Sequence, residues 1–169
     1  MQQLQIKNLK KVRRAIPVIE RKVKIKTSLT KDYVFIKGNE VNCFLVKKIL
    51  LAVDFGFDIE DAFLLLKDDY SLEFINIKEH TRRKNLTEVR ARVIGRQGKA
   101  MRTIEELTGG VVVVMGNVVG LIVDSEHLEP AVQGICSLIG GAKHSNVFSY
   151  LEKQNRELRK MDDGDLGLR

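Results

Sequence analysis

Gly95-Arg96-Gln97-Gly98 is the stretch that decides how this chain of 169 residues is interpreted. Neither glycine has a Cβ atom, so the backbone of another molecule can approach the loop closely. Arg96, together with Lys99 and Arg102, places positive charge at the start of the next helix, where free backbone N–H groups already favour an anion. A phosphodiester backbone is the natural ligand of such a surface.

The segments on either side of this loop differ in period. Residues 86–93 alternate, with Arg90 and Arg92 on one side, and the alternation predicts a strand. Residues 99–107 repeat apolar residues at helical spacing, and Thr108-Gly109-Gly110 predicts the end of that helix. Gly116-Asn117 predicts a two-residue turn between strands. The remaining predictions for this half are strands at 111–115 and 118–123, a helix at 125–139 capped by Ser125, a helix at about 144–160, and a frayed end at 162–169.

The first half shows a similar order of elements. A helix from Leu9 should end or bend at Pro17, and the alternation of Val23 and Ile25 with three lysines predicts a strand with a basic face. The other predicted elements are strands near 4–6 and 33–36, helices at 41–55 and 59–66 with Asp58 as the cap of the second, and an extended segment at 72–77. The polar residues 78–85 are predicted to link the halves, which gives domains 1–79 and 80–169.

Charge is distributed in blocks. The net charge is +7, with one basic block in the first thirty residues and another from Arg82 to Arg102, separated by an acidic stretch from Asp54 to Glu73. This pattern indicates an anionic partner, contacted by two surfaces or by one surface built from both blocks.

Several classes of function have no support in the sequence. Cys43 and Cys136 are far apart and without partners at metal-ligand spacing, which is typical of reduced thiols in a cytoplasmic protein. The three histidines are scattered, the acidic pair Asp68-Asp69 is typical of a turn, and no nucleophile–base pattern is present. We therefore predict no catalytic residue, no metal and no cofactor. Without a signal-like or membrane-spanning apolar run, we expect a cytoplasmic location and no membrane partner.

The run from Val93 to Gly109 resembles a K-homology (KH) domain of the eukaryotic type, or type I. Three further stretches, Asp68–Glu73, Gly140–Ser145 and Val147–Glu152, resemble the two-KH small-subunit ribosome-assembly factors called the partner-of-Nob-one family, in its archaeal form. The resemblance implies an α+β fold of two tandem KH-like units, each with a three-stranded sheet covered by helices, plus a C-terminal helix. In that family the G-x-x-G loop joins two helices and clamps about four nucleotides of a single strand.

The resemblance also implies a function and partners. Single-stranded RNA, the 3′ region of small-subunit rRNA during ribosome biogenesis, is the expected ligand, and the expected protein partners are the endonuclease that trims this end and the assembling small subunit. The expected RNA-binding residues are Arg92, Ile94, Gly95, Arg96, Gln97, Gly98, Lys99, Arg102, Val112 and Val114. The sequence leaves open which alternating set of residues 111–115 lines the groove under the bases.

The first half departs from the family pattern, because its G-x-x-G position falls near Lys7-Asn8-Leu9-Lys10, which has no glycine. We predict a degenerate KH unit that attracts RNA through its lysines or binds protein. Two other functions stay open at this stage: a KH regulator of mRNA or another RNA, and a subunit of an RNA-processing enzyme.

Overall fold

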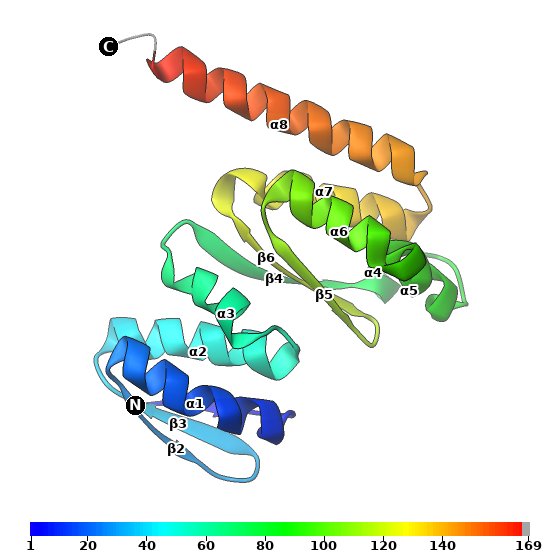
Figure 1. Ribbon diagram of the computed structural model, residues 1–169. Helices are drawn as coiled ribbons and strands as arrows, with labels where there is room; N and C mark the ends of the chain where they lie inside the picture. Colours follow the sequence, from blue (N-terminus) through cyan, green and yellow to red (C-terminus); the bar gives the residue numbers. More distant parts are fainter. Residues whose placement is uncertain (167–169) are drawn as a thin grey trace. The chain divides into compact units, whose positions relative to one another are not determined.

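The computed structural model describes residues 1–166 and divides the chain into two compact α+β units, Met1–Leu72 and Glu73–Arg169. Each unit contains one three-stranded antiparallel sheet and the helices that pack on it (Figure 1). This arrangement confirms the predicted fold class.

The first unit has the order strand, helix, strand, strand, helix. Its elements are β1 (Gln2–Gln5), α1 (Leu9–Val23), β2 (Lys26–Leu29), β3 (Tyr33–Lys37), α2 (Glu40–Phe55), α3 (Ile59–Ala62) and the 3-10 helix η1 (Phe63–Leu66). The strands pair in the order β1-β3-β2, with Leu4 and Leu29 both opposite Val34. Val34 and Ile36 of the central strand are fully buried and form the core with apolar residues of α1 and α2. Asp58 precedes α3 as predicted, but its side chain makes no capping hydrogen bond.

Helix α1 differs from its prediction at both Pro17 and Val23. It continues through Pro17 and ends at Val23, where Lys24 adopts a left-handed conformation (φ 54°). The predicted basic strand at 22–26 is therefore wrong for residues 22–24, which form the end of the helix and its cap, and strand β2 begins only at Lys26. Core residues on both sides of the proline, Val12 and Ile19, hold the helix in place although one backbone hydrogen bond is missing.

The second unit has the order strand, three helices with a 3-10 turn before the third, two strands and two helices. These are β4 (Tyr70–Asn76), α4 (Ile77–His80), α5 (Leu86–Ile94), the 3-10 turn η2 (Arg96–Gly98), α6 (Lys99–Thr108), β5 (Val111–Met115), β6 (Val118–Asp124), α7 (Ser125–Gly140) and α8 (His144–Leu166). The strands pair in the order β4-β6-β5, so the extended segment near residues 72–77 belongs to the second sheet. The division between units accordingly falls at Leu72–Glu73, before the predicted boundary at 79–80. Residues 78–85 include the end of α4 as well as a connecting segment.

The predicted strand at 86–93 is wrong, because this segment is helix α5. Val89 and Val93, four residues apart, are fully buried in the core of the second unit, with Leu86 packed beside them. The Asn85 side chain caps the helix by accepting a hydrogen bond from the backbone N–H of Glu88 (3.3 Å). The spacing of Arg90 and Arg92 therefore does not come from the alternation of side chains along a strand.

Helix α7 is capped by Asp124 in place of the predicted Ser125. Asp124 Oδ1 accepts a hydrogen bond from the backbone N–H of His127 (2.9 Å) and lies 2.8 Å from His127 Nδ1. A carboxylate one residue earlier thus satisfies a free N–H group of the first turn.

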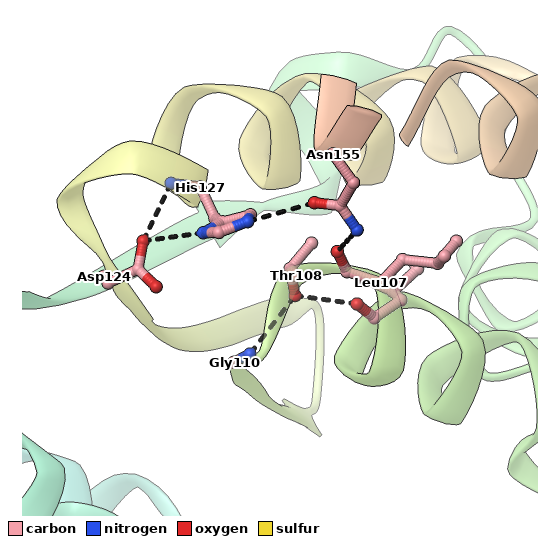
Figure 2. A network of polar contacts seen from close by, with 7 residues as sticks. Leu107, Thr108, Gly110, Asp124, His127 and Asn155 are labelled. Carbon is pink, nitrogen blue, oxygen red and sulfur yellow. Dashed lines mark hydrogen bonds and ion pairs between the residues drawn. The ribbon is translucent and has the colours of Figure 1, made fainter. Parts of the chain in front are cut away.

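Helix α8 packs on α6 and α7 and runs beyond the predicted end at Lys160 to Leu166. Val147 and Leu151 of α8 are buried in the core. Figure 2 shows a polar chain that joins the three helices: His127 Nε2 contacts Asn155 Oδ1 (3.0 Å), and Asn155 Nδ2 donates to the Leu107 carbonyl. The last three residues of the predicted frayed end, 167–169, lie outside the described part of the chain.

Candidate nucleic-acid interface

The Gly95–Gly98 loop joins two helices, α5 and α6, as the KH resemblance implied. Gly95 ends α5 with φ 76°, Gly98 precedes α6 with φ 75°, and Gln97 between them also has a positive φ of 54°. The Gly98 N–H donates to the Gly95 carbonyl (3.2 Å), which closes a tight turn. A left-handed glutamine is uncommon, and such residues cluster at functional sites.

The two glycines have different physical requirements. A Cβ added to Gly95 would lie 2.6 Å from both the backbone nitrogen and the Cβ of Ala100, so no side chain fits there. A Cβ added to Gly98 would meet no protein atom within 4 Å. Gly95 is therefore required for packing inside the protein, whereas Gly98 leaves open space outside it.

Positive charge surrounds this open space. Arg96 and Lys99 come from the loop and the first residue of α6, and the first turn of α6 contains no acidic residue. Arg102 Nη2 donates to the Gln97 carbonyl (2.9 Å), so this arginine also holds the loop in shape. Within the described residues, neither Arg96 nor Lys99 forms an ion pair, and no side chain caps the start of α6. The loop therefore offers unpaired cations beside free helical N–H groups.

Strand β5 lies at the edge of the second sheet, and its alternate valines take different roles. Val112 is opposite Leu121 and Val114 is opposite Val119, and since both partners are in the core, this valine set faces the helices. Val112 is itself buried, with only 2% of its surface exposed, whereas Val114 is partly exposed. Of the two predicted valines, only Val114 has a side chain that a ligand can reach.

Glu105 contacts the outer edge of β5, a role that sequence analysis missed by treating this residue as an exposed helix position. Its Oε1 accepts a hydrogen bond from the Val112 N–H (2.8 Å). No sequence signal reports this contact, because it depends on how α6 packs against the strand. The bond shows that the backbone N–H of Val112 points away from β6.

Arg92 forms its contacts at the turn between α7 and α8. Its Nη2 donates to the Ala142 carbonyl (2.5 Å) at the turn between α7 and α8, and its own carbonyl lies 2.8 Å from His144 Nε2. Its Nε is buried without a hydrogen-bond partner among the described residues. The guanidinium of Arg92 therefore fixes α5 to that turn. A direct contact of Arg92 with RNA stays a prediction. Ile94, at the end of α5, is partly exposed.

The corresponding helix start in the first unit is closed. Asp54 Oδ1 accepts hydrogen bonds from the backbone N–H groups of Lys7 (2.8 Å) and Asn8 (2.6 Å). Lys11 Nζ donates to the Gly56 carbonyl (2.5 Å) and pairs with Asp58 (3.2 Å). A carboxylate of the protein itself therefore occupies the place next to α1 that an external anion would need.

A hollow of about 740 Å³ lies along α7, lined by apolar residues that include Leu128, Val132 and Cys136, with the carboxylates of Glu73 and Glu129 among them. Acidic side chains repel phosphate, so this hollow does not suit RNA. Burial raises the pKa of the Cys136 thiol, which keeps it protonated and unreactive at neutral pH.

Two features are absent from residues 1–166, a cluster of metal-ligating side chains and a helix that could span a membrane. Among residues 1–166, no group of three or more His, Cys, Asp or Glu side chains is arranged to hold a metal ion. None of the described helices combines the length and apolarity that crossing a bilayer requires.

Comparison with known proteins places this geometry in a family. Residues 71–156 match the model of the eukaryotic-type KH domain, KH-domain type I, in the form of the second KH domain of PNO1 proteins. The chain belongs to this family. A KH domain-containing protein of Methanocaldococcus jannaschii is 34% identical over 68% of the chain, and the pre-rRNA-processing protein pno1 of Aspergillus fumigatus is 32% identical over 60% of it. The chain spans about half the length of these curated relatives, 51% of the first and 42% of the second.

Solved structures extend the similarity to the first unit. A protein of unknown function from Aeropyrum pernix is similar over 99% of this chain and 97% of its own, with a TM-score of 0.89 and 28% identity. Dim2p of Pyrococcus horikoshii covers 90% of the chain and 98% of its own length, with a TM-score of 0.80 and 30% identity. The complex of a/eIF2alpha, aDim2p and rRNA from the same organism gives a TM-score of 0.82 and 29% identity over 92% of this chain and 94% of that one.

Proposed function

We propose that this protein binds single-stranded RNA without cleaving it, and that its target is the 3′ region of small-subunit rRNA during maturation. The observation that carries the proposal is the open space at Gly98, next to an uncapped helix start and unpaired cations. A small ligand does not need this exposed, shallow and positively charged surface, but a nucleic-acid backbone does.

The loop supplies the phosphate contacts. The backbone of a strand passes over Gly98, where no Cβ obstructs it, and Arg96 and Lys99 neutralise its charge. The N–H groups at the start of α6 add the partial positive charge of a helix N-terminus. These contacts fix the position of the strand and are independent of its sequence.

The open edge of β5 supplies a contact for a base. The N–H and C=O groups of one strand residue point to the same side, and this side alternates along the strand. Because the backbone N–H of Val112 points outward to Glu105, the backbone N–H and C=O of Val114 also point outward. The side chain of Val114 is partly exposed. A base that is not paired with another strand can bond to this edge, which explains a preference for single-stranded RNA.

The names of the relatives support the choice of RNA. The fungal relative is a pre-rRNA-processing protein, and the Pyrococcus neighbour was solved with rRNA. We extend this to the present chain as binding near the rRNA 3′ end in the cytoplasm, in partnership with the endonuclease that trims that end and with the assembling small subunit. The protein orients the RNA, and the cleavage chemistry belongs to its partner.

A charge reversal in the loop tests the proposal. Arg96→Asp with Gln97→Asp should weaken binding of a labelled single-stranded RNA of the small-subunit 3′ sequence by about tenfold or more at fixed salt. Neither residue belongs to the buried core, so the fold should be retained, which circular dichroism checks. Wild-type affinity should also fall as salt rises, because phosphate neutralisation releases counterions.

The matched control is Lys153→Asp with Gln154→Asp on α8, which makes the same changes of charge away from the loop. We expect the RNA affinity of this control to stay within about threefold of the wild type, because salt screens charges that are distant from the loop. Equal affinities of the loop variant and the wild type would rule out the loop as the RNA site. Degradation of the labelled RNA by purified protein with a divalent metal ion would contradict the non-catalytic function.

A further inference from the structure

Arg90 links α5 to the hairpin between β5 and β6. Its Nη1 donates to the carbonyl of Gly116, at the tip of the hairpin (3.0 Å). The other turn residue is also fixed, because the Asn117 carbonyl accepts a hydrogen bond from the Ile77 N–H (2.8 Å). The hairpin is therefore a short element held at both turn residues, and Arg90 is the side chain that crosses from the helix to it.

The contact between Arg90 and the hairpin lies on the surface that we propose binds RNA. Arg90 and Ile94 are four residues apart, so they share one face of α5, adjacent to the buried stripe of Val89 and Val93. Ile94 leads directly into the Gly95–Gly98 loop, whereas Arg90 reaches the far end of β5, at the hairpin. The loop thus follows the C-terminal end of α5, and Arg90, one turn earlier on the helix, contacts the hairpin at the end of β5.

The bond to Gly116 leaves most of the guanidinium donors of Arg90 unused. A guanidinium has five N–H donors in a planar fork, and the structure assigns one of them to Gly116. Arg90 is partly exposed and has no carboxylate partner among the described residues. Its bond to the hairpin reduces the freedom of the side chain, so the fork is held ready for a ligand.

We propose that Arg90 reads the base at the hairpin end of the bound strand and selects guanine; this inference rests on the proposed RNA-binding function. Guanine presents two adjacent acceptors, O6 and N7, which match the arginine fork. Adenine presents an N6 amino group in place of O6, and this donor faces another donor. Arg90 is therefore a specificity residue at one position, separate from the phosphate contacts of the loop.

Scanning the bases of a bound RNA tests this assignment. In a panel of labelled single-stranded RNAs, each position in turn carries each base, and affinity is measured by fluorescence anisotropy at fixed salt. The wild type should prefer guanine to adenine by about tenfold at one terminal position of the bound segment. Arg90→Lys keeps the charge but replaces the planar fork by a single ammonium, so it should reduce that preference to about threefold or less and leave discrimination at the other positions unchanged.

Arg82→Lys is the matched control, because Arg82 is an exposed arginine of the segment between α4 and α5 and should leave the whole profile unchanged. A uniform loss of affinity for all bases in Arg90→Lys would overturn the inference, since it would mean that Arg90 only holds the hairpin. An unchanged profile would also overturn it. Neither outcome affects the proposed function, which this experiment would contradict only if the wild type did not bind the panel.

Discussion

The β1–α1 junction of the first unit and the Gly95–Gly98 loop of the second unit are both helix starts next to basic residues, yet only the second is open to an anion. In the first unit, Asp54 accepts hydrogen bonds from the backbone N–H groups of Lys7 and Asn8, so these two donors are already satisfied. In the second unit, a Cβ at Gly98 would meet no protein atom within 4 Å. A basic sequence therefore makes a phosphate site only when the protein leaves its backbone donors unused.

The largest effects are expected when a methyl group is added at each glycine of the Gly95–Gly98 loop. Gly95→Ala should lower the free energy of unfolding by about 3 kcal/mol or more and abolish RNA binding, because its Cβ overlaps the backbone of Ala100. Gly98→Ala should lower it by only about 1 kcal/mol, the cost of a left-handed alanine. Urea unfolding measures both values.

RNA titration completes that pair. Gly98→Ala should bind RNA about tenfold more weakly although it is nearly as stable as the wild type, since the added Cβ lies where the strand must pass. Wild-type affinity in folded Gly98→Ala would show that RNA does not approach this glycine, and the two helix starts would no longer differ in function.

The second test removes the internal anion of the first unit. Asp54→Ala leaves the N–H groups of Lys7 and Asn8 without their acceptor, which should destabilise the first unit by about 1–3 kcal/mol in urea unfolding. RNA affinity should stay within about twofold, as expected for a residue outside the interface. Asp69→Ala, an exposed carboxylate in the turn before β4, is the control and should have little effect on stability. A large loss of RNA affinity in Asp54→Ala would show that the β1–α1 junction contributes to binding.

The smallest expected effect concerns the basic face of α1. Arg13 and Arg14 are exposed, and we expect Arg13→Glu with Arg14→Glu to reduce affinity about threefold for any RNA sequence. The slope of log affinity against log salt should decrease by about two, since each arginine that is removed leaves one phosphate without its counter-charge. An unchanged slope would show that only the second unit attracts RNA.

The elements that depend on local sequence were largely predictable. The hairpin at Gly116-Asn117, the end of α6 at its glycine pair and the starts of α7 and α8 are correct within a residue or two. The strand predicted at 86–93 was wrong because Arg90 and Arg92 alternate for unrelated reasons: one contacts the hairpin and the other the α7–α8 turn. Only tertiary contacts distinguish these roles, and in a short segment they override the apparent period.

The candidate site divides in the same way. The loop itself and its cations could be located from sequence, because the glycine spacing and the charges are local. The closure of the first unit by Asp54 could not, since its partners are 46 and 47 residues away. The contact of Glu105 with Val112 was missed for a similar reason, because it requires knowing how α6 packs beside β5.

The polar chain from Asp124 through His127 and Asn155 to Leu107 determines how much of α8 the second unit needs in order to stay complete. Asn155 is the link that ties α8 into this chain, and the match to the KH family stops one residue later, at residue 156. A protein that inherited the domain only as far as α7 would leave the Leu107 carbonyl without its Asn155 donor and the core without Val147 and Leu151. The first half of α8 is thus inseparable from the domain.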